Sequence, residues 1–440
     1  MSFLLPLCDS VIVVAFALLL RRDQLRLTHP ALAYLAYHFF SVTLRLWGLF
    51  LGAPFGFQFF YSPTNQDFFR AFLISDLGLI AIGFGFWLGR AKDLKPVRAG
   101  VPLSRNLVLG VALIAGVLSI GGSLTFEDYG INNVREVTVI DGRNIDANGY
   151  VTSTTLWLIP SLVLLVYRFG PRKPLLVLLS AAIAMRLYTG WNRFSFLLPT
   201  IVACAVLLEQ AGRKWPTIKQ VFVGLAIFAV FSAGKGFVRT VVDVGWDENT
   251  LPEAVARLQE NLTGAGEIGF FDQSVIVAAA IPERAGYLLG RYYYLPFVMW
   301  VPRVYWPDKP SFAEELHQLS VQSGFPMEEI GMVPTFHGAN YANFGFFGVI
   351  LIGIPMGWIC IRLFHKAYAC DYGSAQRLMY ILFWGCLLQI FRDGLMGVPI
   401  LLYNTGFPIY FACITCLIGA FFARWLGHQP QKVHLSLEPK

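Results

Sequence analysis

The chain alternates apolar runs of membrane-spanning length with short polar loops, and one long hydrophilic segment, residues 238–343, interrupts this pattern. Hydrophobic residues make up 56% of the 440 residues and charged residues only 14%. Crossing a hydrocarbon core about 30 Å thick takes about 20 helical residues, and in lipid only helices or closed barrels satisfy their own backbone. Because the apolar runs are uninterrupted, the sequence predicts an all-α, polytopic membrane protein.

The apolar runs predict about eleven transmembrane helices and three parts of the chain. The predicted spans cover residues 3–20, 30–52, 70–89, 106–122, 151–167, 174–189, 194–209, 220–237, 344–363, 374–391 and 398–423. The parts are an eight-span bundle at 1–237, the long loop at 238–343, and a three-span bundle with a cytoplasmic tail at 344–440. Within the loop, Pro, Gly, Arg and Tyr break up the stretch 270–300. This pattern predicts helices that lie in the interface or dip partly into the bilayer.

Four short loops rich in Lys and Arg predict the orientation of the chain. They lie at residues 21–26, 90–105, 168–173 and 213–219. By the positive-inside rule these loops face the cytoplasm, so the long loop is expected in the periplasm of a bacterial inner membrane. A full span within 270–300 would instead reverse the C-terminal part. The formal net charge of +7 is explained by these loops and anionic lipid headgroups, without a nucleic-acid partner.

Several kinds of site are not supported by the sequence. The seven cysteines form no disulfide framework, and Cys413 and Cys416, a CxxC pair inside an apolar run, are expected to pack rather than to bind metal. The chain has no HExxH, GxxxxGK or GxGxxG motif. Zinc-protease, P-loop and dinucleotide chemistry are therefore unsupported.

Arginines at membrane depth are the first candidate binding residues. A charge there costs about 2.5 to 3.5 kcal/mol on insertion scales, so Arg45 and Arg186 need an explanation. Each is expected to contact substrate, to extend to the interface, or to pair with a neighbour such as Asp76. At the outer end of the following turn, Arg193 stands beside Trp191, where a phosphate or sugar could be held.

Further cations lie at the predicted outer membrane face. Lys235 and Arg239 are four residues apart, so one helix face presents both of them to an anion or to the headgroup layer. Arg291 heads the run RYYYLPFVMW, and Arg303 lies in VPRVYWPDKP. The aromatic rings in these runs are suited either to stacking on sugars or to the interface belt. In contrast, Arg392 and Asp393 are expected to pair with each other.

His337 begins the segment HGANYANFG just before the ninth predicted span. A neutral imidazole at a membrane surface can accept a proton from a sugar hydroxyl, because its pKa lies near the working pH. A structural histidine with satisfied hydrogen bonds is the alternative. The sequence therefore makes His337 a candidate general base.

Two of these segments carry a family resemblance. PRVYWPDKP, followed about thirty residues later by YANFGFFGVILIGIPMG, resembles the oligosaccharide repeat-unit polymerases of bacterial polysaccharide export, the Wzy type. The resemblance is sharpest over residues 290–360 and weaker at GWNRF. Where the family commonly has GELYxNFG, this chain has GANYANFG, with Ala339 in place of the acid. His337, two residues earlier, is the available substitute for that acid.

The resemblance implies a glycosyltransferase of the GT-C type that joins repeat units carried on undecaprenyl pyrophosphate at the periplasmic face. It implies no nucleotide sugar, no cofactor and no metal, and it adds membrane lipid and a chain-length regulator protein as partners. A glycan ligase using the same carrier, a transporter or flippase of lipid-linked sugars, and a noncatalytic assembly partner are the alternatives. A transporter would use charges along a path, and the sequence suggests no chain of acids and bases across the bilayer.

In this interpretation each candidate residue has a role in transfer from a pyrophosphate. Negative charge grows on the departing phosphate, and forked guanidinium groups suit phosphate oxygens. The catalytic residues are expected to be Arg193, Arg239 and Arg303 at the pyrophosphate and His337 at the acceptor hydroxyl. The substrate-binding residues are expected to be Arg186, Lys235, Arg291, Trp191 and Tyr341.

Overall fold

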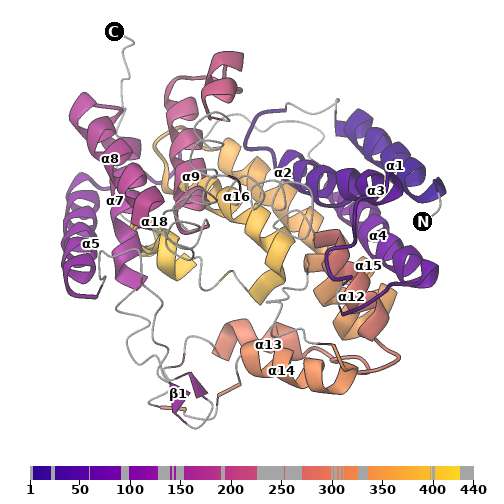
Figure 1. The fold of residues 1–440 in the computed structure, drawn as a ribbon. Coiled ribbons are helices and arrows are strands. Elements are labelled where there is room, and N and C mark those ends of the chain that lie inside the picture. The colour runs from indigo at the N-terminus through magenta and orange to yellow at the C-terminus, as the bar shows by residue number, and fades with distance from the viewer. Residues whose placement is uncertain are drawn as a thin grey trace.

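The computed structural model shows a helical membrane protein (Figure 1). It describes residues 3–20, 25–58, 60–90, 99–126, 139–140, 143–144, 153–189, 194–224, 252, 270–298, 301, 305–306, 309–310, 312–325, 335–396, 398 and 402–426. Four of the described helices are long and apolar enough to cross a membrane: α4 (Asn65–Gly89), α5 (Arg105–Phe126), α15 (Phe336–Tyr368) and α18 (Phe407–Trp425). The prediction of a helical membrane protein is confirmed to that extent, and the count of eleven spans stays a prediction.

The remaining elements are shorter. The other helices are α1 (Leu4–Leu20), α2 (Pro30–His38), α3 (Leu44–Phe50), α7 (Leu158–Phe169), α8 (Lys173–Thr189), α9 (Phe194–Gln210), α12 (Phe270–Ala280), α13 (Arg291–Val298), α14 (Phe312–Ser323) and α16 (Ala375–Asp393). The π-helical turns are η1 (Phe39–Thr43) and η4 (Leu402–Gly406), and the 3-10 turns are η2 (Ser153–Trp157) and η3 (Gly394–Met396). Strands β1 (Val139–Ile140) and β2 (Arg143–Asn144) pair antiparallel.

Helix α4 shows how local sequence sets an element. Thr64 and Asp67 form a capping box, in which the Thr64 hydroxyl accepts from the Asp67 amide and the Asp67 carboxylate accepts from the Thr64 amide. These bonds satisfy backbone donors that the first helical turn leaves open. The apolar run then continues to Gly89 without a proline. The helix therefore begins five residues before the predicted span at 70–89 starts.

The basic loops meet at one end of the bundle. Arg168 Nε donates to the Leu103 carbonyl at 2.9 Å, and the Leu27 amide donates to the Lys214 carbonyl at 3.0 Å. Helices α13 and α14 lie across the opposite end (Figure 1). The alternation of ends predicted from charge therefore agrees with the described helices. That the basic end faces the cytoplasm stays a prediction.

Helices α4 and α15 pack with their backbones in contact. A Cβ on Gly353 would lie 2.9 Å from Ala81 Cβ, and one on Gly89 would lie 2.4 Å from Ile361 Cγ2. Higher residue numbers in α4 meet higher residue numbers in α15, so the two helices run parallel. A Cβ on Gly85 would lie 2.1 Å from a backbone oxygen of α15. Small residues permit such approach, and in lipid close packing replaces the hydrophobic effect as the force between helices.

Helix α15 folds back on itself near its start. Phe344 and Gly345 have non-helical dihedral angles, and the positive φ of 63° at Gly345 favours glycine. A Cβ on Gly348 would lie 2.5 Å from the Asn340 carbonyl oxygen. Residues eight apart in a straight helix are about 12 Å apart, so this contact requires a reversal. Residues 336–343, here called the first arm of α15, run alongside the second arm, residues 346–368.

Helix α12 lies beside the first arm of α15. Ser274 Oγ is 3.3 Å from Thr335 Oγ1, and the Tyr341 hydroxyl donates to the Ile281 carbonyl at 3.2 Å. The first contact joins the starts of the two segments and the second joins their ends, so α12 and the first arm run parallel. With 11 residues, α12 is too short to span a bilayer. Helix α12 and the first arm are therefore two half-length helices in the half of the bundle nearest α13 and α14.

Candidate functional site

The start of the RYYY run and the NYANFG segment, both within the stretch 290–360 where the family resemblance is sharpest, are hydrogen-bonded to each other. Asn343 joins them, because its Oδ1 accepts from the Gly290 amide at 2.8 Å while its Nδ2 donates to the Ala339 carbonyl at 2.7 Å. The Tyr293 hydroxyl donates to Asn340 Oδ1 at 2.6 Å. The asparagines of NYANFG therefore fix the RYYY run against the turn between the two arms of α15.

Exposed aromatic side chains lie within and on either side of the RYYY run in the sequence. The aromatic rim consists of Tyr287, Tyr294, Phe297, Tyr305 and Trp306, all of them exposed. The side chain of Arg291 is 53% exposed, lying 3.8 Å from the Glu315 carboxylate. Burial raises the pKa of the Glu315 carboxyl, and Arg291 opposes that rise. The rim offers ring faces and a cation at the end of the bundle opposite the basic loops.

His337 lies inside the bundle, so the prediction that it stands at the membrane surface is wrong. It is 4% exposed, and the Tyr34 hydroxyl lies 2.5 Å from its Nε2. Its ring packs on Gly78, in the middle of α4, where a Cβ would lie 2.3 Å from Nδ1. The cause is the reversal at Gly345, which turns the first arm inward. Nδ1 has no hydrogen-bond partner among the described residues.

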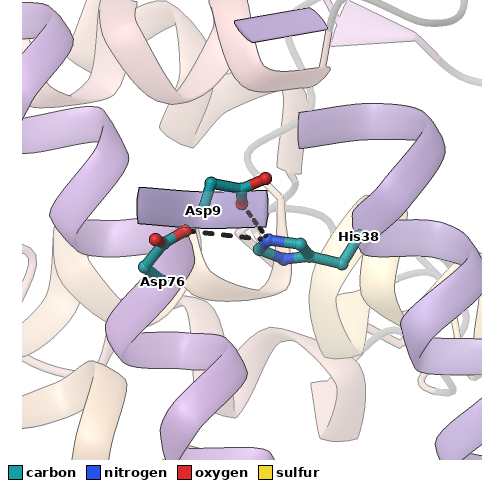
Figure 2. A group of neighbouring side chains, drawn as sticks. All are labelled: Asp9, His38 and Asp76. Carbon is teal, nitrogen blue, oxygen red and sulfur yellow. Dashed lines mark hydrogen bonds and ion pairs between the residues drawn. The ribbon is translucent and has the colours of Figure 1, made fainter. Parts of the chain in front are cut away.

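Asp9, His38 and Asp76, from helices α1, α2 and α4, converge within the bundle (Figure 2). His38 Nε2 lies 2.7 Å from Asp9 Oδ1 and 3.7 Å from Asp76 Oδ1. Asp9 is 0%, His38 1% and Asp76 3% exposed. Within the described structure, both oxygens of Asp76 and Oδ2 of Asp9 accept no hydrogen bond. The group is here called the Asp–His–Asp cluster.

Arg45 forms a buried pair with Asp272 of α12. Its Nε and Nη2 donate to the two carboxylate oxygens at 2.9 and 2.6 Å, and Nη2 also donates to the Pro54 carbonyl. Asp272 accepts a further bond from the Gly56 amide at 2.8 Å. The suggested pairing of Arg45 with Asp76 is therefore wrong. The guanidinium instead fastens α12 to the end of α3, a structural role.

Glu209 forms a second buried ionic group at the basic end. Its Oε1 accepts from the Tyr368 hydroxyl at 2.5 Å and lies 3.5 Å from Arg26 Nη1. Its Oε2 accepts from Arg377 Nη2. Both guanidinium groups also lie over the Tyr368 ring. Here each carboxylate oxygen has a donor, and two arginines offset one acid.

The other predicted site residues divide into two groups. Arg193, Trp191, Lys235, Arg239 and Arg303 lie outside the described residues, and so does the side chain of Arg186 on α8. Their convergence on a pyrophosphate stays a prediction. Tyr341 is buried, and its hydroxyl donates to a backbone carbonyl. The mutual pairing of Arg392 and Asp393 is confirmed, with Nε 3.1 Å from Oδ1.

Four buried residues were missed by the sequence reasoning: Asp9, His38, Asp76 and Asp272. Three of them could have been found from the sequence, because Asp9, His38 and Asp76 lie in predicted spans. A charge at membrane depth is costly there, just as it is for Arg45. The expectation that no chain of acids and bases crosses the bilayer stays a prediction, but a local buried group of acids and histidines was not foreseen. The cluster and the neighbouring Tyr34–His337 pair form such a group.

Comparison of the chain with models of protein families, with curated proteins and with solved structures gives no match. The functional interpretation therefore depends on the residues and contacts described above.

Proposed function

We propose that the protein is a polymerase that joins undecaprenyl-pyrophosphate-linked oligosaccharide repeat units at the periplasmic face of a bacterial inner membrane. The observation that supports this proposal is the junction at Asn343, which joins the start of the RYYY run, rich in exposed aromatic side chains, to the NYANFG segment. Aromatic faces stack on sugar rings, and Arg291 adds a cation suited to a phosphate. Donor and acceptor chains would meet at this end of the bundle.

The proposed transfer is a single displacement. The acceptor hydroxyl oxygen bonds to the anomeric carbon of the donor, and the bond from that carbon to the pyrophosphate oxygen breaks. The pyrophosphate keeps the electron pair, and Arg193, Arg239 and Arg303 stabilise its growing charge. The hydroxyl proton passes to His337. No metal is needed for these steps.

The first arm of α15 offers two polar atoms for the acceptor. Nδ1 of His337 and Nδ2 of Asn340 have no hydrogen-bond partner among the described residues. The two residues are three apart on a helix, so they share one face. Because Nδ1 of His337 lies against Gly78, an acceptor sugar would have to enter between the first arm and α4 to reach this base.

A flippase or transporter of lipid-linked sugars is a second candidate, favoured by two specific observations. Helix α15 is broken at Gly345, and several acids and histidines are buried within the bundle. Broken helices and buried ionisable residues are typical of transport sites. Transport would move the carrier between leaflets without forming a glycosidic bond.

The proposal is tested with the full chain in lipid nanodiscs, supplied with undecaprenyl-pyrophosphate-linked repeat units from the source bacterium. We expect a ladder of lengthened glycans. His337→Ala should reduce chain extension by about 100-fold or more, the usual scale for losing acid–base help. The matched control is Arg213→Ala, since Arg213 is exposed at the basic end.

Each alternative gives a different result in this system. A single transfer to a lipid-core acceptor, without a ladder, indicates a ligase and contradicts the proposal. Carrier movement between leaflets of proteoliposomes without any lengthening indicates a flippase. A normal ladder from His337→Ala removes His337 from the mechanism, and the orienting role then passes to Asn340 or Asn343.

A further inference from the structure

The Asp–His–Asp cluster carries more negative charge than the described residues around it balance. Neither Asp9 nor Asp76 forms an ion pair with any Lys or Arg among the residues that the structure describes. Arg45, a nearby buried cation, is committed to Asp272. The imidazole of His38 can offset at most one of the two carboxylates. A further uncompensated carboxylate at this depth is costly, so something else must offset it.

The cluster has the donors of a metal site. One nitrogen of His38 and one oxygen from each aspartate lie within 4.8 Å of one another. Donor atoms around a tetrahedral ion with bonds of about 2.0 to 2.1 Å stand about 3.3 Å apart. The two aspartate oxygens lie 2.7 and 3.7 Å from His38 Nε2, on either side of that value. Small side-chain shifts would bring all three donors to one centre.

We propose that Asp9, His38 and Asp76 bind one divalent transition-metal ion of the zinc class inside the bundle. The observation that points to a ligand is that neither oxygen of Asp76, itself 3% exposed, accepts a hydrogen bond from a described residue. Two carboxylates and a neutral imidazole make an electrically neutral site with a divalent ion. An imidazole nitrogen suits zinc and its neighbours better than magnesium or calcium, which prefer oxygen ligands only.

The ion would connect three helices that are far apart in sequence. It ties α1 and α2 to the middle of α4, and the ring of Tyr34, which pairs with His337, lies 6.2 Å from that of His38. A bound ion would thereby hold in place the helices that flank the first arm of α15. This inference does not rest on the proposed reaction, in which the metal takes no part.

The test begins with the wild-type full chain, purified in detergent without chelators. Elemental analysis by mass spectrometry should find about one zinc-class ion per chain. X-ray absorption at the metal edge should show nitrogen and oxygen neighbours with an imidazole signature and no sulfur. Zn²⁺ added to chelator-treated protein should raise the Tm, and Mg²⁺ at the same concentration should not.

Variants locate the ion. His38→Gln and Asp76→Asn should each weaken metal binding at least tenfold, judged by retention during dialysis. His317→Ala and Asp371→Asn make comparable changes outside the cluster and should retain the ion. If the two cluster variants fail to fold, the wild-type metal content and absorption spectrum decide alone.

Three results would overturn the inference. Less than about a tenth of an ion per chain, with no effect of Zn²⁺ on the Tm, would mean that shared protons offset the carboxylates. Sulfur neighbours in the absorption spectrum would place the ion at Cys413 and Cys416. Full metal retention in folded His38→Gln and Asp76→Asn would place it elsewhere in the chain.

Discussion

The Glu209 group and the Asp–His–Asp cluster are both buried and ionic, but they are completed differently. Each oxygen of Glu209 has a donor, and Arg26 and Arg377 offset its charge. Three of the four oxygens of Asp9 and Asp76 accept no hydrogen bond within the described structure. A buried ionic group whose hydrogen bonds are all made by the protein is structural, whereas buried oxygens that accept no hydrogen bond point to a ligand. This difference separates two kinds of buried charge in one membrane bundle.

The largest effect is expected at the completed Arg45–Asp272 pair. Arg45→Met leaves Asp272 buried and unpaired, which should cost about 3 to 5 kcal/mol in the free energy of unfolding. The double variant Arg45→Met/Asp272→Leu should recover most of that loss, because it removes both charges. Unfolding by denaturant in detergent measures both. A double variant as unstable as the single one would show that the pair was not the cause.

A smaller loss is expected for Glu209→Gln. The amide keeps the shape but removes the charge that Arg26, Arg377 and Tyr368 share, so we expect about 2 kcal/mol of destabilisation. The substitution should lower the free energy of unfolding by the same amount at high and at low salt, because the group is largely shielded from solvent. The measurement is the free energy of unfolding in both salts. No loss would mean that the arginines are satisfied without Glu209.

The opposite sign is expected for Asp76→Asn in chelator-treated protein. The substitution removes one of two neighbouring carboxylates that pair with no described Lys or Arg, and should stabilise the metal-free protein by on the order of 1 kcal/mol. In zinc-loaded protein the same change should destabilise, because it removes a ligand. Thermal unfolding with and without Zn²⁺ measures both. The comparison with Glu209 breaks down if Asp76→Asn destabilises the metal-free protein as Glu209→Gln does.

The smallest effect concerns Glu315, outside the membrane spans. Burial raises the pKa of its carboxyl above the usual value near 4.3, so its contribution to stability is complete below that value. The contribution is lost as pH rises through the folded-state pKa. Glu315→Gln removes this loss, so the variant and wild type should match near pH 4 and the variant should have the higher Tm near pH 7. Equal Tm values at both pH values would contradict the assignment.

The sequence predicted the helices where a long apolar run sufficed to define them. The runs at 3–20, 106–122 and 374–391 closely match α1, α5 and α16. The predicted span at 344–363 begins at the break in α15, but the helix before the break, residues 336–343, was missed, because its glycines and asparagines indicated a turn. Hydropathy reports whether a segment prefers lipid, but the direction of the backbone within it depends on packing against other helices.

The sequence indicated which types of residue could form a site, but not how deep they lie in the bundle or which residues they contact. Arg45 was recognised as needing a partner, yet that partner, Asp272, is 227 residues away in a segment interpreted as interfacial. His337 was placed by counting from the next span, and the fold-back then moved it inward. The cluster of Asp9, His38 and Asp76 requires three helices to pack together, which no local pattern encodes.

The fold-back of α15 also determines which experiments can detect the first arm. A segment that enters and leaves the bilayer from the same side changes no loop's compartment, so reporter fusions and impermeant labels would give the same result with or without it. Probes of depth are required, such as the accessibility of a spin label at residues along 336–343 to membrane-soluble oxygen and to aqueous quenchers. Such probes should show a gradient that reverses at Gly345, with immersion greatest near His337 and least at the turn.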